Sequence, residues 1–226
     1  MIWRREHRLN MKNIFKVVFV LILLSLAVGY LYREPIKQRI FALITQGMFV
    51  AVDNDDFDPG PAIHSHFPGL QATYQDRSIT LIDEFKGVNG TAVIASRSFD
   101  WCPYCMRQII QLQENKAGFD AAGIGMVAIT YDDPVLQQAF IEKFGITIPV
   151  VSDVNALSFK TLGILNKNYS PGEFQYGIPH PGMIVIDPQG KVVGKLFLEA
   201  YSLRVDAAAA LAFAKTALGL DPPLIK

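Results

Sequence analysis

Two cysteines, Cys102 and Cys105, constrain this chain more than any other feature, because they are its only cysteines and lie two residues apart. An apolar run over 91–95 comes just before them, and a helical pattern over 106–113 comes just after. A strand that leads into a helix would place Cys102 at the helix N-terminus, where free N–H groups and the helix dipole stabilise a thiolate. Pro103 would lie in the first turn, where its missing N–H costs nothing. The segment therefore predicts a redox-active dithiol that can close to a disulfide.

Two other interpretations of the cysteine pair are weaker. A zinc site needs four ligands, and the chain has no second cysteine pair to complete one. His64 and His66 are the nearest candidates, but they lie far upstream in an irregular stretch, so we expect surface histidines. A purely structural disulfide would close a very short loop, which constrains the unfolded chain little. No metal and no cofactor is expected beyond the Cys102–Cys105 disulfide itself.

Composition sets the size of the protein and argues against one class of function. A chain of 226 residues, 50% of them hydrophobic, fits one globular domain and an additional segment. The 21 basic and 21 acidic residues balance, and no long basic run is present. Nucleic-acid binding therefore lacks its electrostatic signature. Confinement of both cysteines to one motif suits a compartment in which stray thiols would be oxidised.

The N-terminal segment predicts insertion into a membrane. Residues 14–32 are apolar apart from Lys16, and at about 1.5 Å per residue they are just long enough to cross a bilayer core. The basic residues that precede them favour a cytoplasmic N-terminus and a domain on the exoplasmic, periplasmic side; they are Arg4, Arg5, Arg8 and Lys12. A cleaved signal peptide with a small-residue site at 27–29 is the alternative. Under either interpretation the rest of the chain is exported.

We therefore divide the chain into three parts. Residues 1–33 form a cytoplasmic leader and a transmembrane anchor, or a signal peptide. Residues 34–66 form a juxtamembrane helix and a linker, and apolar residues at three- and four-residue steps predict that the helix covers 34–52. Residues 67–220 form the redox domain.

Strand and helix patterns alternate in the redox domain. Strands are expected at 91–96, 123–130 and 148–151, and helices at 103–117, 133–144 and 156–162. A hairpin follows, with strands at 183–187 and 191–198, and a last helix covers 206–218. This order predicts an α/β fold, in which a sheet carries helices on both faces.

The chain resembles the thioredoxin superfamily, and more closely its exported redoxin and peroxiredoxin-related members of the alkyl hydroperoxide reductase–thiol-specific antioxidant type. The similarity covers about residues 67–220, and its carriers are 101–105, 130–132, 151–153 and 177–187. It implies a thioredoxin-like three-layer sandwich with a mixed central sheet, here preceded by one transmembrane helix. It also implies that Pro181 is a cis proline that faces the dithiol.

The resemblance implies a mechanism as well. The Cys102 thiolate attacks a substrate disulfide, and Cys105 then attacks Cys102 to release the reduced substrate. The implied partners are exported proteins or small thiols and disulfides, with a partner protein that recycles the dithiol. Positioning of the substrate is implied for five residues: Trp101, Pro103, Tyr104, His180 and Pro181.

The sequence departs from both related families near the cysteines. Thioredoxins carry a buried acid six residues before the first cysteine, where this chain has Ser96. Peroxiredoxins place Thr or Ser where this chain has Phe99, and an arginine where it has Pro181. By default, we expect Arg97 to lie on the surface. Arg97 and Ser98 are nevertheless the residues that could replace the Thr or Ser and the arginine of peroxiredoxins, which activate the peroxidatic cysteine.

Three functions follow from these observations. A membrane-anchored thiol–disulfide oxidoreductase is the leading one. The alternative is a thiol peroxidase in which Cys102 is the peroxidatic cysteine and Cys105 resolves the product. A non-catalytic thioredoxin-like binding module is the third, and the intact dithiol counts against it.

Overall fold

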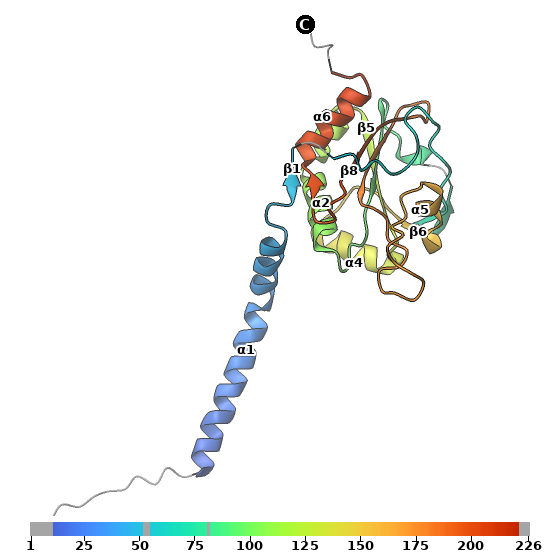
Figure 1. The fold of residues 1–226 in the computed structure, drawn as a ribbon. Coiled ribbons are helices and arrows are strands. Elements are labelled where there is room, and N and C mark those ends of the chain that lie inside the picture. Colours follow the sequence, from blue (N-terminus) through green and yellow to red (C-terminus); the bar gives the residue numbers. More distant parts are fainter. Residues whose placement is uncertain (1–10, 52–54, 81, 222–226) are drawn as a thin grey trace, which may run out of the picture. The chain divides into compact units, whose positions relative to one another are not determined.

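The computed structural model describes residues 11–51, 55–80 and 82–221 (Figure 1). Its contacts divide the chain between Gln46 and Gly47 into two units. The first unit contains a single long helix, and the second contains the sheet and both cysteines. The basic leader residues Arg4, Arg5 and Arg8 lie outside the described residues.

The N-terminal helix α1 (Met11–Ile44) contains the expected span at 14–32. Within the part of the chain that the structure describes, no single helix meets the length and hydropathy that a membrane crossing requires. Two helical stretches, Ile14–Tyr30 and Tyr32–Ile44, meet these criteria together, with a bend of 49° between them. Pro35 explains the bend, because a proline lacks the N–H that would bond the carbonyl one turn earlier and its ring crowds that turn.

The expected helix over 34–52 is wrong at its C-terminal end. Helix α1 ends at Ile44, and Phe49–Val50 form the strand β1. Gly47 follows the helix with a φ of 71°, a left-handed conformation that ends helices and that glycine adopts without strain. Burial of Met48 then fixes the extended chain on the second unit.

A seven-stranded mixed sheet forms the centre of the second unit. The strands in spatial order are β3 (Arg77–Ile79), β2 (Ala72–Tyr74), β6 (Val150–Asp153), β5 (Ile124–Thr130), β4 (Gly90–Ala95), β7 (Gly182–Ile186) and β8 (Val192–Phe197). β4 runs parallel to β5 and antiparallel to β7, and β7 and β8 form the expected hairpin. The structure therefore confirms the mixed central sheet.

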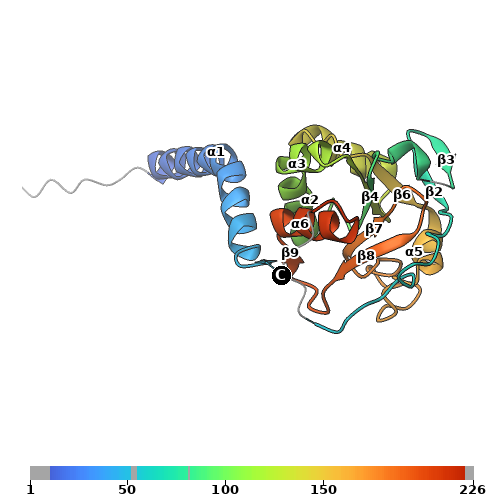
Figure 2. The same cartoon turned by 90° about the horizontal axis from the view of Figure 1, so that it is seen from above.

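Helices cover both faces of this sheet, as the sequence predicts (Figure 2). Ala92 and Ile94 of β4 belong to a core that includes side chains of α2 (Pro103–Glu114), α3 (Lys116–Ala121), α4 (Pro134–Phe144) and α6 (Ala207–Ala217). Val93 and Ala95 alternate to the other face, toward η1 (Asp83–Phe85), η2 (Val154–Ala156) and α5 (Leu157–Thr161). The alternation is the two-residue period of a strand that is buried on both sides.

A second, two-stranded sheet was not expected from the sequence. β1 pairs in parallel with β9 (Arg204–Val205), so that Phe49 lies opposite Arg204 and Val50 opposite Val205. Figure 1 shows the blue strand beside the red segment that precedes α6. Residues from the two ends of the second unit therefore meet next to α6.

Candidate functional site

The two cysteines lie at the start of α2, as the sequence predicts. Cys102 is the N-cap residue, and Pro103 occupies the first turn. The Cys102 Sγ accepts a hydrogen bond from the Cys105 N–H at 3.3 Å, and the two Sγ atoms lie 2.6 Å apart. Both side chains are almost fully buried, with exposed fractions of 1% for Cys102 and 0% for Cys105.

Asp132 holds the loop that joins β4 to these cysteines. Its buried carboxylate accepts the Phe99 N–H at 2.6 Å and the Thr130 hydroxyl at 3.0 Å. The Ser98 hydroxyl accepts the N–H groups of Asp100 and Trp101. Burial raises the pKa of Asp132, although the hydrogen bonds to its carboxylate act in the opposite direction. These bonds fix the backbone directly before Cys102.

Two buried arginines lie against the dithiol. The Arg204 Nη2 donates to the Cys105 Sγ at 3.3 Å. Arg97 is only 7% exposed, so its expected surface position is wrong. Its Nη2 donates to the Tyr201 carbonyl at 3.0 Å, and the Arg204 Nη1 donates to the same oxygen at 2.9 Å. The two guanidinium groups are thus joined through one carbonyl.

The arginines change the ionisation of the sulfur pair. Burial alone would raise the pKa of Cys105, but the hydrogen bond from Cys102 and the charges of Arg204 and Arg97 lower it well below its ordinary value. The pKa of Cys102 is raised by its hydrogen bond to Cys105, by burial and by the negative charge on Cys105. Within the pair, these influences therefore favour a thiolate at Cys105 over one at Cys102.

Aromatic side chains pack against Trp101 and Tyr104, the two aromatic residues of the cysteine motif. The Trp101 Nε1 donates to the Tyr131 hydroxyl at 2.9 Å, and its ring lies 5.4 Å from that of Phe174. The Tyr104 ring meets Tyr201 edge-on at 6.0 Å. The contacts that fix Trp101 and Tyr104 therefore come from residues outside the motif, and their role in positioning a substrate stays a prediction.

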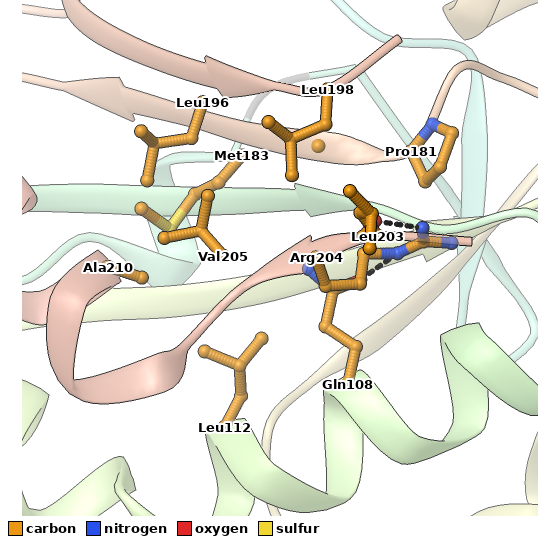
Figure 3. Close-up of a pocket in the computed structure, with 11 residues that line it drawn as sticks. Gln108, Leu112, Pro181, Met183, Leu196, Leu198, Leu203, Arg204, Val205 and Ala210 are labelled. Carbon is orange, nitrogen blue, oxygen red and sulfur yellow. Dashed lines mark hydrogen bonds between the residues drawn. The ribbon is translucent and has the colours of Figure 1, made fainter. Parts of the chain in front are cut away.

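The cis conformation expected for Pro181 is wrong, because no described peptide bond is cis. Pro181 lies instead in the wall of a cavity of about 20 Å³ that Arg204 also lines (Figure 3). A volume of this size holds about one water molecule. The His180 ring is half-buried and packs edge-on against Phe57 at 4.8 Å, and burial lowers its pKa.

Arg204 is the site residue that sequence reasoning missed. It is 2% exposed and far from the cysteines in the chain, so no local motif marks it. Its Nε donates to the Gln108 Oε1 at 3.0 Å, and Figure 3 shows Gln108 directed toward it from α2. One feature of the sequence could have pointed to such a partner. Gln108 lies one turn after Cys105 on the buried side of the helix, and a buried polar side chain needs a hydrogen-bond partner.

Comparisons with known proteins point to one family. A model of the AhpC/TSA family matches residues 63–195, more than half of the chain. A curated Mycobacterium tuberculosis protein named as a peroxiredoxin is 28% identical over 91 residues, which are 40% of this chain and 57% of that protein. The chain thus spans less than two thirds of the length of the curated relatives it matches.

Solved structures support the same fold. A peroxiredoxin-like protein from Aquifex aeolicus has a TM-score of 0.59 at 20% identity, over 71% of this chain and 90% of its own. Peroxiredoxin 6 of Arenicola marina has a TM-score of 0.59 at 14% identity, over 67% of this chain and 71% of its own. Members of this family are cysteine-based oxidoreductases, and the buried dithiol fits that class.

Proposed function

Because the chain belongs to the AhpC/TSA family, we propose that it is a thiol-dependent peroxidase that uses the Cys102–Cys105 dithiol. Cys102 attacks the peroxide, and Cys105 resolves the product. The observation that carries this proposal is a dithiol that is almost wholly buried beside two guanidinium groups.

Burial of the sulfurs favours a small oxidant. Cys102 is 1% exposed, so a disulfide on a folded protein cannot approach its Sγ in line without rearrangement of the site. A peroxide is much smaller and needs only a narrow path. The cis proline that would support docking of a substrate strand in a thioredoxin is also missing at Pro181.

The arginines supply the fixed positive charge and the hydrogen-bond donor that peroxide reduction requires. The Nε of Arg97 is buried and has no hydrogen-bond partner among the described residues. Its guanidinium charge acts on both cysteines. A peroxide oxygen at the dithiol would give this donor a partner, and a fixed positive group stabilises the charge that develops on the leaving oxygen.

The reaction balances with a peroxide, written ROOH, as the oxidant. The Cys102 thiolate attacks one peroxide oxygen, the O–O bond breaks, and ROH leaves after it takes up a proton, so that Cys102 becomes a sulfenic acid. Cys105 then attacks the Cys102 sulfur, which forms the disulfide and releases water. An external dithiol returns the pair to the reduced state by thiol–disulfide exchange, for which the buried sulfurs must become accessible.

Thiol–disulfide exchange on exported proteins, which the sequence alone favours, becomes the second candidate. The Trp101–Cys105 segment favours it, because Cys105 lies within reach of Cys102 and two aromatic side chains, Trp101 and Tyr104, flank the motif. The same dithiol would then accept electrons from, or donate them to, a protein partner rather than a peroxide.

Pre-steady-state kinetics separate the two candidates. The reduced full-length protein is mixed with hydrogen peroxide or with an oxidised protein disulfide, and the loss of free thiols is followed in each reaction. The proposal expects peroxide to react at least about tenfold faster, which corresponds to ~1.4 kcal/mol in the barrier. Faster oxidation by the protein disulfide would instead assign the chain to disulfide exchange.

We further infer that α1 anchors the protein in a membrane and that the redox domain lies on the exoplasmic, periplasmic side. The apolar run at 14–32 and the basic residues before it support this placement. Confinement of both cysteines to the redox motif agrees with an oxidising compartment.

A further inference from the structure

Arg204 is held against the dithiol from two directions. Its side chain is fixed by α2, since Gln108 accepts from Nε at 3.0 Å and Cys105 accepts from Nη2 at 3.3 Å. Its backbone is fixed by β1, because the Arg204 N–H donates to the Met48 carbonyl at 2.8 Å and the Asp206 N–H donates to the Val50 carbonyl at 2.8 Å. Backbone bonds therefore hold the chain at the arginine and two residues after it.

Both strands of this pair lie outside the part of the chain that the family model matches, which is residues 63–195. β1 precedes that part, and β9 follows it. Met48 is 2% exposed and Arg204 is 2% exposed, so the pair is a packed element and not a surface contact. The match to the family thus accounts for the dithiol but not for the arginine that touches it.

We propose that the β1–β9 pair, residues 48–50 with residues 204–206, is a clasp that positions Arg204 against Cys105 and makes the N-terminal strand part of the redox site. The clasp acts by holding the guanidinium where a thiolate forms. Arg204 is a positioning residue for the dithiol in this account, and Val50 acts through it. The proposal concerns the charge of the dithiol, so it does not depend on whether the oxidant is a peroxide.

Strand geometry gives a matched pair of variants. The N–H and the carbonyl of one strand residue point to the same side, and the Val50 carbonyl faces β9. The Val50 N–H therefore also faces β9, whereas the Phe49 N–H faces away. A proline lacks this N–H, so Val50→Pro disrupts the clasp and Phe49→Pro is the control.

The readout is the pH at which the thiolate forms in the reduced full-length protein, followed by its ultraviolet absorbance. The charged or titratable groups that act on Cys105 are Cys102, Arg204 and Arg97. Removal of a nearby positive charge makes ionisation harder, so Arg204→Met should move the midpoint up by about 1–3 pH units. Val50→Pro should move it up by part of that amount, and Phe49→Pro should leave it unchanged.

A double-mutant cycle shows whether Val50 acts through Arg204. In the Arg204→Met background, Val50→Pro should cause no further shift. An equal shift in both backgrounds would overturn the proposal, as would no effect of Val50→Pro beside a clear effect of Arg204→Met. If Val50→Pro fails to fold, Val50→Gly weakens the strand more gently and enters the same cycle. Failure to react with peroxide would refute the proposed activity but leave these shifts in place.

Discussion

At the residue scale, the chemistry depends on which of two neighbouring sulfur atoms ionises. The Sγ atoms of Cys102 and Cys105 lie 2.6 Å apart, and each changes the ionisation of the other. The helix end favours a thiolate at Cys102, whereas Arg204 and Arg97 favour the charge on Cys105. Attack by Cys102, as proposed, therefore requires a proton to move from Cys102 to Cys105. The role of Cys102 as nucleophile stays a prediction.

Local sequence identified the cysteines and named Arg97 among the residues that could activate them, but it did not identify Arg204. Cys102 and Pro103 follow from spacing and helix-end chemistry, and both lie where the sequence predicts. Arg204 reaches Cys105 through a tertiary contact, which no neighbouring residue encodes. Peroxiredoxins carry their activating arginine at the position that Pro181 occupies here. In this structure, Arg97 and Arg204 reach the dithiol from other parts of the chain instead.

At the element scale, the start of α6 connects the clasp to the helix that carries the cysteines. The Asp206 carboxylate caps α6 by accepting the N–H groups of Ala208 and Ala209. Its other oxygen accepts the Gln111 Nε2 of α2 at 2.6 Å. The Gln111 Oε1 in turn accepts the Ala207 N–H at 3.1 Å. This cap therefore fixes the end of β9 as well as the start of α6.

Asp206→Ala should destabilise the fold more than the equivalent change at another helix. Asp133 caps α4 with one hydrogen bond, to the Val135 N–H, and no bond to a second helix is recorded for it within the described residues. Asp133→Ala should cost about 1 kcal/mol of unfolding free energy, and Asp206→Ala about 2 kcal/mol. Urea unfolding of the two variants measures the difference. Equal costs would show that the bond from Gln111 adds nothing.

Elements with a clear period were predictable, and short ones were not. The alternation of β4, β5 and the helices after them follows from apolar runs and from Asp133 and Pro134 at the start of α4, and the structure confirms it. The two-residue strands β1 and β9 are too short for a repeating pattern. They exist because distant segments pair, which local patterns do not reveal. The apolar steps over 34–52 therefore predict a helix along their whole length.

At the scale of the whole molecule, the proposed membrane anchor determines in which compartment the redox chemistry takes place. A reporter that is active only in the periplasm, fused after Lys226, should be active under the proposed topology, in which the basic leader keeps the N-terminus in the cytoplasm. The same reporter fused after Met11 is the control and should be silent. An inactive reporter after Lys226, in a fusion that accumulates to the same level, would contradict the proposed topology.

The account rests on the claim that Cys102 is oxidised directly by peroxide. The decisive measurement is mass spectrometry of the full-length Cys105→Ser variant after one equivalent of hydrogen peroxide, in the presence of dimedone, which traps sulfenic acids. Removal of Cys105 leaves the sulfenic acid without its resolving thiol, so the account predicts a dimedone adduct on Cys102. An unmodified Cys102, together with an adduct on Cys105 in the Cys102→Ser variant, would reverse the two roles. The absence of an adduct from both variants would contradict the peroxidase itself.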